Sequence, residues 1–171
     1  MKRAIHPQAV ADEPLAVRWV TDVDLPVGRV LALGSVTVER EEVLAFARQY
    51  DPQPFHLDED AAAKSMFGKL SASGWHTCAM AMGVMVRGFL HESSSLGSPG
   101  LEQIKWLKPV FPGDTLTLTQ TITESRPMAS RPDVGLTRTL WKMFNQHGEQ
   151  VLLMDGYGMF RRRVPGAAAE S

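Results

Sequence analysis

The sequence predicts an α+β fold in which an antiparallel β-sheet wraps around one long central α-helix. A segment that begins at Ser73 or Gly74 has apolar residues at the three-and-four spacing of a helix face, and few polar residues elsewhere. From Leu101 onward, four segments alternate apolar and polar residues, as strands do. Their connections are too short for crossover helices, so consecutive strands should be antiparallel neighbours.

The first predicted elements are a strand over residues 31–38 and a helix over residues 39–48. Two glutamates fall in the first turn of this helix, where they complement its dipole, and Pro52 should stop it. An N-terminal arm of about residues 1–16 and a frayed tail of about residues 165–171 should flank the body of a single domain.

The central helix is predicted to be buried on nearly all sides, because a helix that is apolar all round has no face for solvent. Gly83 within it should be tolerated if another backbone approaches closely there. Ser73 should cap its first turn, the commoner role for a serine in that place. Its predicted apolar face comprises Trp75, Cys78, Ala79, Met82, Met85, Val86 and Phe89.

The segment over residues 115–123 is the clearest strand, with threonines on one face and aliphatic residues on the other. Trp106 and Trp141 are expected to face the helix as core residues. The four predicted strands are residues 101–108, 115–124, 134–145 and 150–163.

Composition and charge exclude several classes of function. With 171 residues, 44% hydrophobic content and a net charge of −1, the chain resembles an ordinary globular protein without a general electrostatic attraction for nucleic acid. No apolar run approaches the roughly 18 residues of a membrane span, and no secretory signal is evident. A single cysteine excludes an intrachain disulfide, so a reducing cytoplasm is the expected location.

The most informative segment is Tyr50-Asp51-Pro52-Gln53-Pro54-Phe55-His56, directly after the first predicted helix. Its two prolines restrict the backbone, so that a carboxylate and an imidazole stand at a fixed separation in a stiff, turned loop. Such a pair is typical of proton transfer. Read alone, Asp51 could equally be a turn residue, and His56 a partner of a backbone carbonyl.

The order of elements and the motifs resemble the MaoC-like dehydratase or (R)-specific enoyl-CoA hydratase family, whose members have the hotdog fold. The resemblance extends over nearly the whole chain. It is carried by Phe46-Ala47, Tyr50 to Asp58, Phe67-Gly68, Ser73 to Thr77, Pro109 to Asp114, Ser130 to Asp133, Asn145-Gln146 and Gly148-Glu149.

The resemblance implies an enoyl-CoA hydratase that reversibly adds water to a 2-enoyl-CoA of fatty acid metabolism, giving a 3-hydroxyacyl-CoA. Asp51 and His56 match the family's water-activating pair, and Gly74 matches its glycine N–H for the thioester oxygen. The resemblance also implies a homodimer or higher homo-oligomer. No cofactor is expected, since coenzyme A is part of the substrate.

Ser73, Trp75 and Phe55 are the expected substrate-binding residues, and Trp75 should narrow the acyl tunnel. Gln53 departs from the family loop, which often carries asparagine there. The coenzyme A phosphates could contact Arg161 to Arg163, Lys105 or Lys108, or these cations could be simply solvated.

Other chemistries have weaker support in the sequence. His76 and Cys78 lie two apart on a helix, so they do not share a face on which to bind a metal, and no metal site is expected. Cys78 belongs to the apolar stripe and is expected to be a small buried hydrophobe. Two alternatives remain open: an acyl-CoA thioesterase on the same fold, and a non-catalytic acyl-CoA-binding module. Acyl length and branching, and an acyl carrier protein as the carrier, are also open.

Overall fold

A computed structural model of the chain describes residues 25–163. The predicted arm and tail, and residues 17–24 and 164 of the predicted body, lie outside the described residues.

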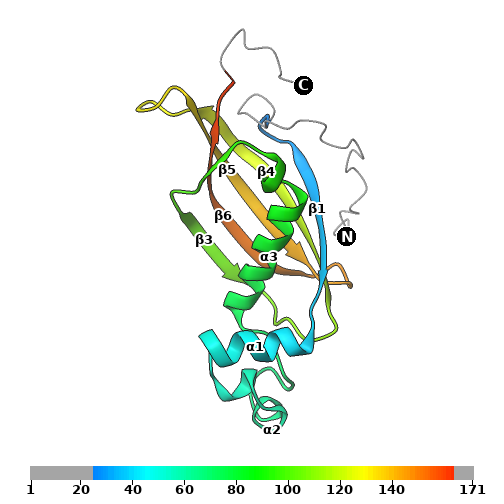
Figure 1. The fold of residues 1–171 in the computed structure, drawn as a ribbon. Helices are drawn as coiled ribbons and strands as arrows, with labels where there is room; N and C mark the ends of the chain where they lie inside the picture. Colours follow the sequence, from blue (N-terminus) through cyan, green and yellow to red (C-terminus); the bar gives the residue numbers. More distant parts are fainter. Residues whose placement is uncertain (1–24, 164–171) are drawn as a thin grey trace.

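The sheet has six antiparallel strands and curls around one face of a helix, forming the hotdog fold (Figure 1). The strand order is β1-β4-β5-β6-β2, and β3 also pairs with β6. The four predicted strands and the first one are therefore confirmed, whereas β2 was missed because it is very short and lies in a Gly/Ser/Pro loop. The bounds are β1 Val30–Thr37, β2 Ser95–Gly97, β3 Leu101–Trp106, β4 Thr115–Pro127, β5 Val134–Phe144 and β6 Gln150–Arg161.

The central helix α3 lies across the sheet, and α1 and α2 lie beyond its N-terminal end (Figure 1). Both predicted helices are confirmed, with Glu41 and Glu42 in the first turn of α1. The bounds are α1 Arg40–Tyr50, the 3-10 turn η2 Pro54–His56, α2 Glu59–Ala63, α3 Gly74–Gly88 and the 3-10 turn η3 Leu90–Glu92.

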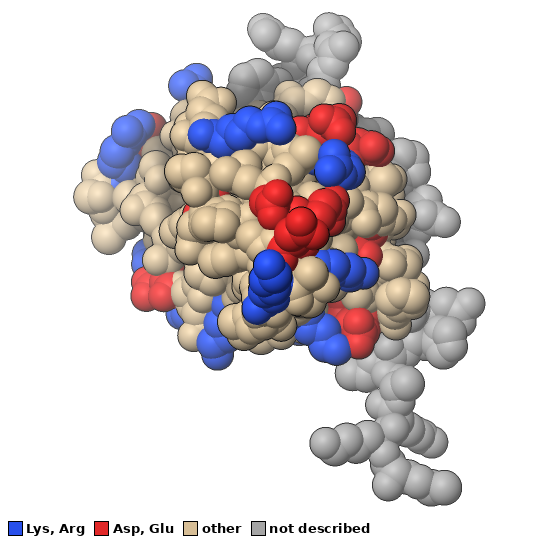
Figure 2. Space-filling view, turned by 90° about the horizontal axis from the view of Figure 1, so that it is seen from below, with Lys and Arg blue, Asp and Glu red and all other residues tan. Residues whose placement is uncertain are grey.

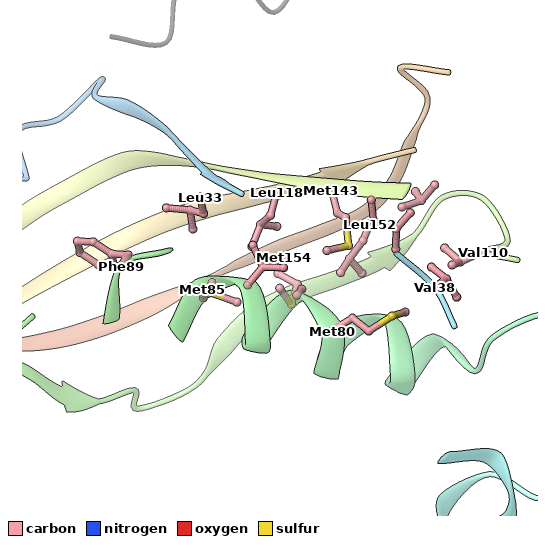
Figure 3. Close-up of a cluster of buried hydrophobic side chains, with 14 of the residues drawn as sticks. Leu33, Val38, Met80, Met85, Phe89, Val110, Leu118, Met143, Leu152 and Met154 are labelled. Atoms are coloured by element: carbon pink, nitrogen blue, oxygen red, sulfur yellow. The ribbon is translucent and has the colours of Figure 1, made fainter. Parts of the chain in front are cut away.

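The core lies between α3 and the concave face of the sheet (Figure 3). Leu118, Met143 and Leu152 pair across β4, β5 and β6 and are fully buried beneath the helix. The predicted alternation in β4 is confirmed, because its aliphatic residues are buried and its threonines point to the other face. Each such buried side chain contributes about 1.5–3 kcal/mol relative to exposure.

The prediction that α3 is buried on nearly all sides is wrong for the single chain. Trp75 is 58%, Met82 51% and Val86 41% exposed, whereas the polar His76 and Thr77 are buried. The helix packs against only one sheet, so the apolar side chains that this sheet does not cover stay largely exposed. The imidazole of His76 instead stacks on Phe46, with 4.8 Å between ring centroids. Burial lowers the pKa of His76, although the charge of Glu42 opposes this, so the imidazole stays neutral at neutral pH.

The expected core position of Trp106 is also wrong, because this side chain is 46% exposed at the end of β3. Trp141 is partly buried and packs against the core. The close backbone approach on α3 occurs at Gly88 and not at Gly83. A Cβ at Gly88 would collide with the carbonyl oxygen of Leu33, whereas one at Gly83 would meet only the end of the Arg87 side chain.

The face around α1 and α2 mixes positive and negative side chains (Figure 2). Arg40 at the start of α1 forms an ion pair with Glu59 of α2, at 3.2 Å. Within the described residues, no helix combines the length and apolar character needed to cross a membrane.

Candidate active site

The loop after α1 brings Asp51 and His56 together, as the sequence predicts. Asp51 follows the last residue of α1 and has a non-helical backbone (φ −147°, ψ 66°), in keeping with the bias against helical geometry before Pro52. Pro54 then begins the turn η2, whose last residue is His56. The Asp51 Oδ2 and His56 Nε2 atoms are 3.5 Å apart, and both side chains are largely buried.

Both oxygens of Asp51 accept hydrogen bonds. Ser73 Oγ donates to Oδ2 at 2.6 Å, and Gln53 Nε2 donates to Oδ1 at 2.7 Å. Burial acts to raise the pKa of Asp51, but these two hydrogen bonds and the charge of His56 outweigh it and hold the pKa below its ordinary value of 3.8. Asp51 is therefore a carboxylate at neutral pH.

The hydrogen bonds of His56 define which ring nitrogen carries the proton. His56 Nδ1 lies 2.7 Å from the carbonyl oxygen of Ser71, and a carbonyl can only accept. Nδ1 must therefore carry a hydrogen, and in the neutral imidazole Nε2 has a free lone pair. This lone pair lies on the side of Asp51, so both groups can accept from one water molecule.

Gly74 is the first residue of α3, and Ser73 caps the helix by accepting from the N–H of Trp75 at 3.2 Å. The capping prediction for Ser73 is confirmed, but the hydroxyl also donates to Asp51, so one side chain links the helix end to the carboxylate. The N–H of Gly74 belongs to the first turn, whose amides have no intrahelical acceptor and attract negative charge.

Trp106 covers the start of α3. Its indole Nε1 donates to the carbonyl oxygen of Gly74 at 2.8 Å, and a Cβ at Gly74 would lie 2.7 Å from the same nitrogen. Only glycine therefore fits this close approach without moving the indole.

The candidate residues share one cleft of about 460 Å³. Phe55 lines this cleft and its ring meets His56 edge-on, with 4.6 Å between ring centroids. Trp75 lines it from α3, and its ring packs edge-on against Trp106 at 5.2 Å. Ser73 is not a lining residue of this cleft and takes part in the site as a hydrogen-bond donor to Asp51.

Sequence reasoning missed three supporting groups. Gln53 was read as a departure from the family, yet it holds Asp51. Trp106 was read as core, yet it contacts Gly74. Ser71 acts through its main chain, so no sequence signal could have identified it.

The basic residues considered for the coenzyme A phosphates differ in their distance from the cleft. Lys108 lines the cleft and forms an ion pair with Glu149. Arg161 is the last residue of β6 and lies far from the cleft. In β6, Leu152 pairs with Trp106, which lines the cleft, and Arg161 follows Leu152 by nine residues, about 30 Å along the strand.

Neither a metal centre nor a reactive thiol is supported by the described side chains. Burial raises the pKa of the Cys78 thiol despite a hydrogen bond involving Trp106, which disfavours the thiolate. Residues 25–163 contain no cluster of three or more His, Cys, Asp or Glu side chains arranged to hold a metal ion.

The arrangement can therefore hold a water molecule between a carboxylate and a basic nitrogen, beside a helix N-terminus. A polarised carbonyl oxygen could accept from that terminus. These elements suit the addition of water to a carbonyl-activated substrate.

Comparison with known proteins identifies the class to which this hotdog domain belongs. Residues 24–140, more than half of the chain, match the family described as MaoC like domain, so the chain belongs to that family. Its structural neighbours include a MaoC-like dehydratase and an (R)-hydratase.

The chain is also similar to individual proteins of known structure or sequence. The crystal structure of a MaoC-like dehydratase from Rhodospirillum rubrum is 38% identical, with a TM-score of 0.78, over 85% of this chain and 99% of that one. An (R)-hydratase from A. caviae involved in PHA biosynthesis is 25% identical, with a TM-score of 0.62, over 78% and 96% of the two chains. The uncharacterized protein YdeM of Bacillus subtilis (strain 168) is 26% identical over 133 residues, 78% of this chain and 92% of YdeM.

Proposed function

We propose that the protein is a hydro-lyase that reversibly hydrates a 2-enoyl-CoA thioester to a 3-hydroxyacyl-CoA. The observation that carries this proposal is the Asp51–His56 pair, 3.5 Å apart, in one cleft with the N-terminus of α3. Membership of the MaoC-like family supports the reaction class.

In this mechanism Asp51 and His56 hold the attacking water. The water donates one hydrogen to Asp51 Oδ2 and the other to His56 Nε2. We assign the role of base to His56, because the imidazole Nε2 has a free lone pair in this tautomer, whereas the lowered pKa of Asp51 makes its carboxylate a poor proton acceptor. As the water oxygen bonds to C3, His56 takes its proton, and the Asp51 carboxylate stabilises the imidazolium.

Gly74 supplies the third element. Attack at C3 moves electrons onto the thioester oxygen, where the Gly74 N–H and the α3 dipole stabilise the developing enolate. Return of the proton from His56 to C2 completes the addition, so that one water has supplied the hydroxyl group and the hydrogen. Phe55 and Trp75, which line the cleft, contact the substrate near the double bond.

The active unit in this proposal is a homodimer. An exposed apolar surface extends from α3 to the edge strand β3, and in the described chain β3 pairs with β6 alone. Joining two copies side by side along β3 would pair these edges and bury the exposed apolar side chains. This surface comprises Trp75, Met82, Val86, Leu101, Trp106 and Leu107.

The test is hydration of short and medium 2-enoyl-CoA thioesters, followed by loss of enoyl absorbance and, in parallel, by release of free thiol. Asp51→Asn and His56→Ala should each lower turnover by on the order of a hundredfold or more without unfolding the protein. Asp60→Asn and His147→Ala, at two exposed residues outside the cleft, are matched controls that should retain activity. Unchanged rates in both site variants would refute the mechanism, and thiol release would indicate a thioesterase.

A further inference from the structure

A second cavity, also of about 460 Å³, lies between α3 and the concave face of the sheet. Trp75 lines both this cavity and the catalytic cleft, so the two spaces are adjacent at the Trp75 side chain. The α3 side of the cavity is formed by Cys78, Met82, Met85 and Phe89.

Small side chains on the sheet make room for this cavity. The strands contribute rows of paired residues that face the helix, and the row of Leu118, Met143 and Leu152 is filled by large side chains (Figure 3). Further along the strands, Thr137, Thr139 and Gly158 line the cavity instead. The missing side-chain volume leaves a space that extends away from Trp106 and the catalytic cleft.

Gln120 is the only amide side chain among the described residues that line this space, most of which are apolar. It belongs to the row next to that of Leu118 and lies opposite Trp141 in β5. Its side chain lines the cavity and is only 2% exposed. Its Nε2 has no hydrogen-bond partner among the described residues. A buried donor left unpaired is unfavourable, so its presence requires an explanation.

Trp141 fixes the orientation of the Gln120 amide. The Trp141 Nε1 lies 3.3 Å from Gln120 Oε1, and an indole nitrogen can only donate. The amide oxygen must therefore face Trp141, and the amide N–H₂ is the polar group presented to the cavity. The hydroxyl group of Thr137 has a partner, because it donates to the Gly158 carbonyl at 3.4 Å.

We infer that the cavity receives an acyl chain that carries a neutral oxygen atom, and that Gln120 recognises this oxygen. This inference rests on the proposed hydratase function and specifies its substrate class. An oxygen that accepts from Nε2 would satisfy the unpaired donor while the rest of the chain contacts apolar walls. None of the described lining residues carries a formal charge, so a carboxylate would be buried without a counter-ion. A ketone, ether or hydroxyl oxygen fits better.

The test compares 2-enoyl-CoA thioesters of equal length with and without a ketone oxygen, placed at successive carbons from C5 onward. The wild-type protein should favour one ketone position by about tenfold in kcat/KM over the unsubstituted chain, the value of one well-placed hydrogen bond. Gln120→Met should abolish this preference, because methionine fills the same space, offers Trp141 a weak acceptor and has no donor. Gln120→Leu serves as a second variant should the first fold poorly.

Thr121→Val is the matched control, because Thr121 is adjacent on β4 and points to the opposite face of the sheet; it should keep the preference. Calorimetric binding of the corresponding saturated acyl-CoA pairs gives a readout that requires no turnover.

Each outcome decides the inference separately from the hydratase proposal. If the protein hydrates the ketone and the unsubstituted chains with equal kcat/KM, or if the Gln120 variants keep the wild-type preference, the role of Gln120 is refuted and the hydratase function still stands. Tighter binding of the ketone chain without any hydration, lost in the Gln120 variants, would support the role of Gln120 and refute the hydratase. Equal binding of both chains without hydration would overturn both.

Discussion

Replacing Gly74 by alanine should disturb the site through one identifiable contact. The added Cβ would lie 2.7 Å from Nε1 and 2.8 Å from Cε2 of Trp106, well inside van der Waals contact. The indole must move, and its hydrogen bond to the Gly74 carbonyl would be lost. Overpacking costs about 1–3 kcal/mol and the hydrogen bond about 0.5–1.5 kcal/mol, against a gain of up to about 1 kcal/mol in helix propensity.

The net loss of stability in Gly74→Ala should therefore be about 0.5–4.5 kcal/mol, measured by denaturant unfolding. The proposed oxyanion donor would move with the helix start, so kcat/KM should fall about tenfold or more. Gly83→Ala is a matched control on the same helix, since its Cβ would meet only the Arg87 guanidinium at 3.2 Å. Adding Trp106→Leu should restore part of the stability of Gly74→Ala. Equal stability and activity of the two alanine variants would refute this reasoning.

Three further predictions concern the cap, the pH dependence and the oligomer. Ser73→Ala should cost about 1–3 kcal/mol of unfolding free energy, because it removes both a helix cap and a hydrogen bond to a carboxylate; a loss below about 0.5 kcal/mol would contradict this dual role. Because the pKa of Asp51 is lowered in the folded protein, its contribution to stability is complete above about pH 3.8 and is lost as the pH falls through the lower folded value. Ser73→Ala should move the acid loss of this stability contribution to higher pH, and Asp51→Asn should remove the contribution altogether. Unfolding free energies measured across the acid range test both. Val86→Glu should convert a dimer into monomers in light scattering, whereas Val27→Glu, at an even more exposed valine that precedes β1, should not; an unchanged mass for Val86→Glu would place the interface elsewhere.

Much of the fold could be predicted from the sequence because local patterns and global packing agree. The alternation in β4 places Leu116, Leu118 and Ile122 in the core, as its period of two requires. The end of α1 followed from Pro52, which cannot continue a helix. The Asp51–His56 pairing followed from prolines that restrict the loop between them.

The errors arose where contacts depend on partners far away in the sequence. Periodicity showed that α3 is apolar around most of its circumference, but not which side the sheet covers. Trp75 and Val86 were therefore expected to be buried and are exposed in the single chain. The role of Gln120 could not be predicted either. A glutamine within a strand pattern does not indicate that a cavity lies beside it or that Trp141 orients its amide.

The central claim is that water is added to C3 of a 2-enoyl thioester while the thioester stays intact. The most direct test is incubation of the protein with a medium-chain 2-enoyl-CoA in ¹⁸O-labelled water, with mass spectrometry of the product. The account predicts one ¹⁸O atom in the 3-hydroxyl group of an intact acyl-CoA, and almost none with Asp51→Asn. Label in a free carboxylate, accompanied by released coenzyme A, would contradict the account and identify a thioesterase.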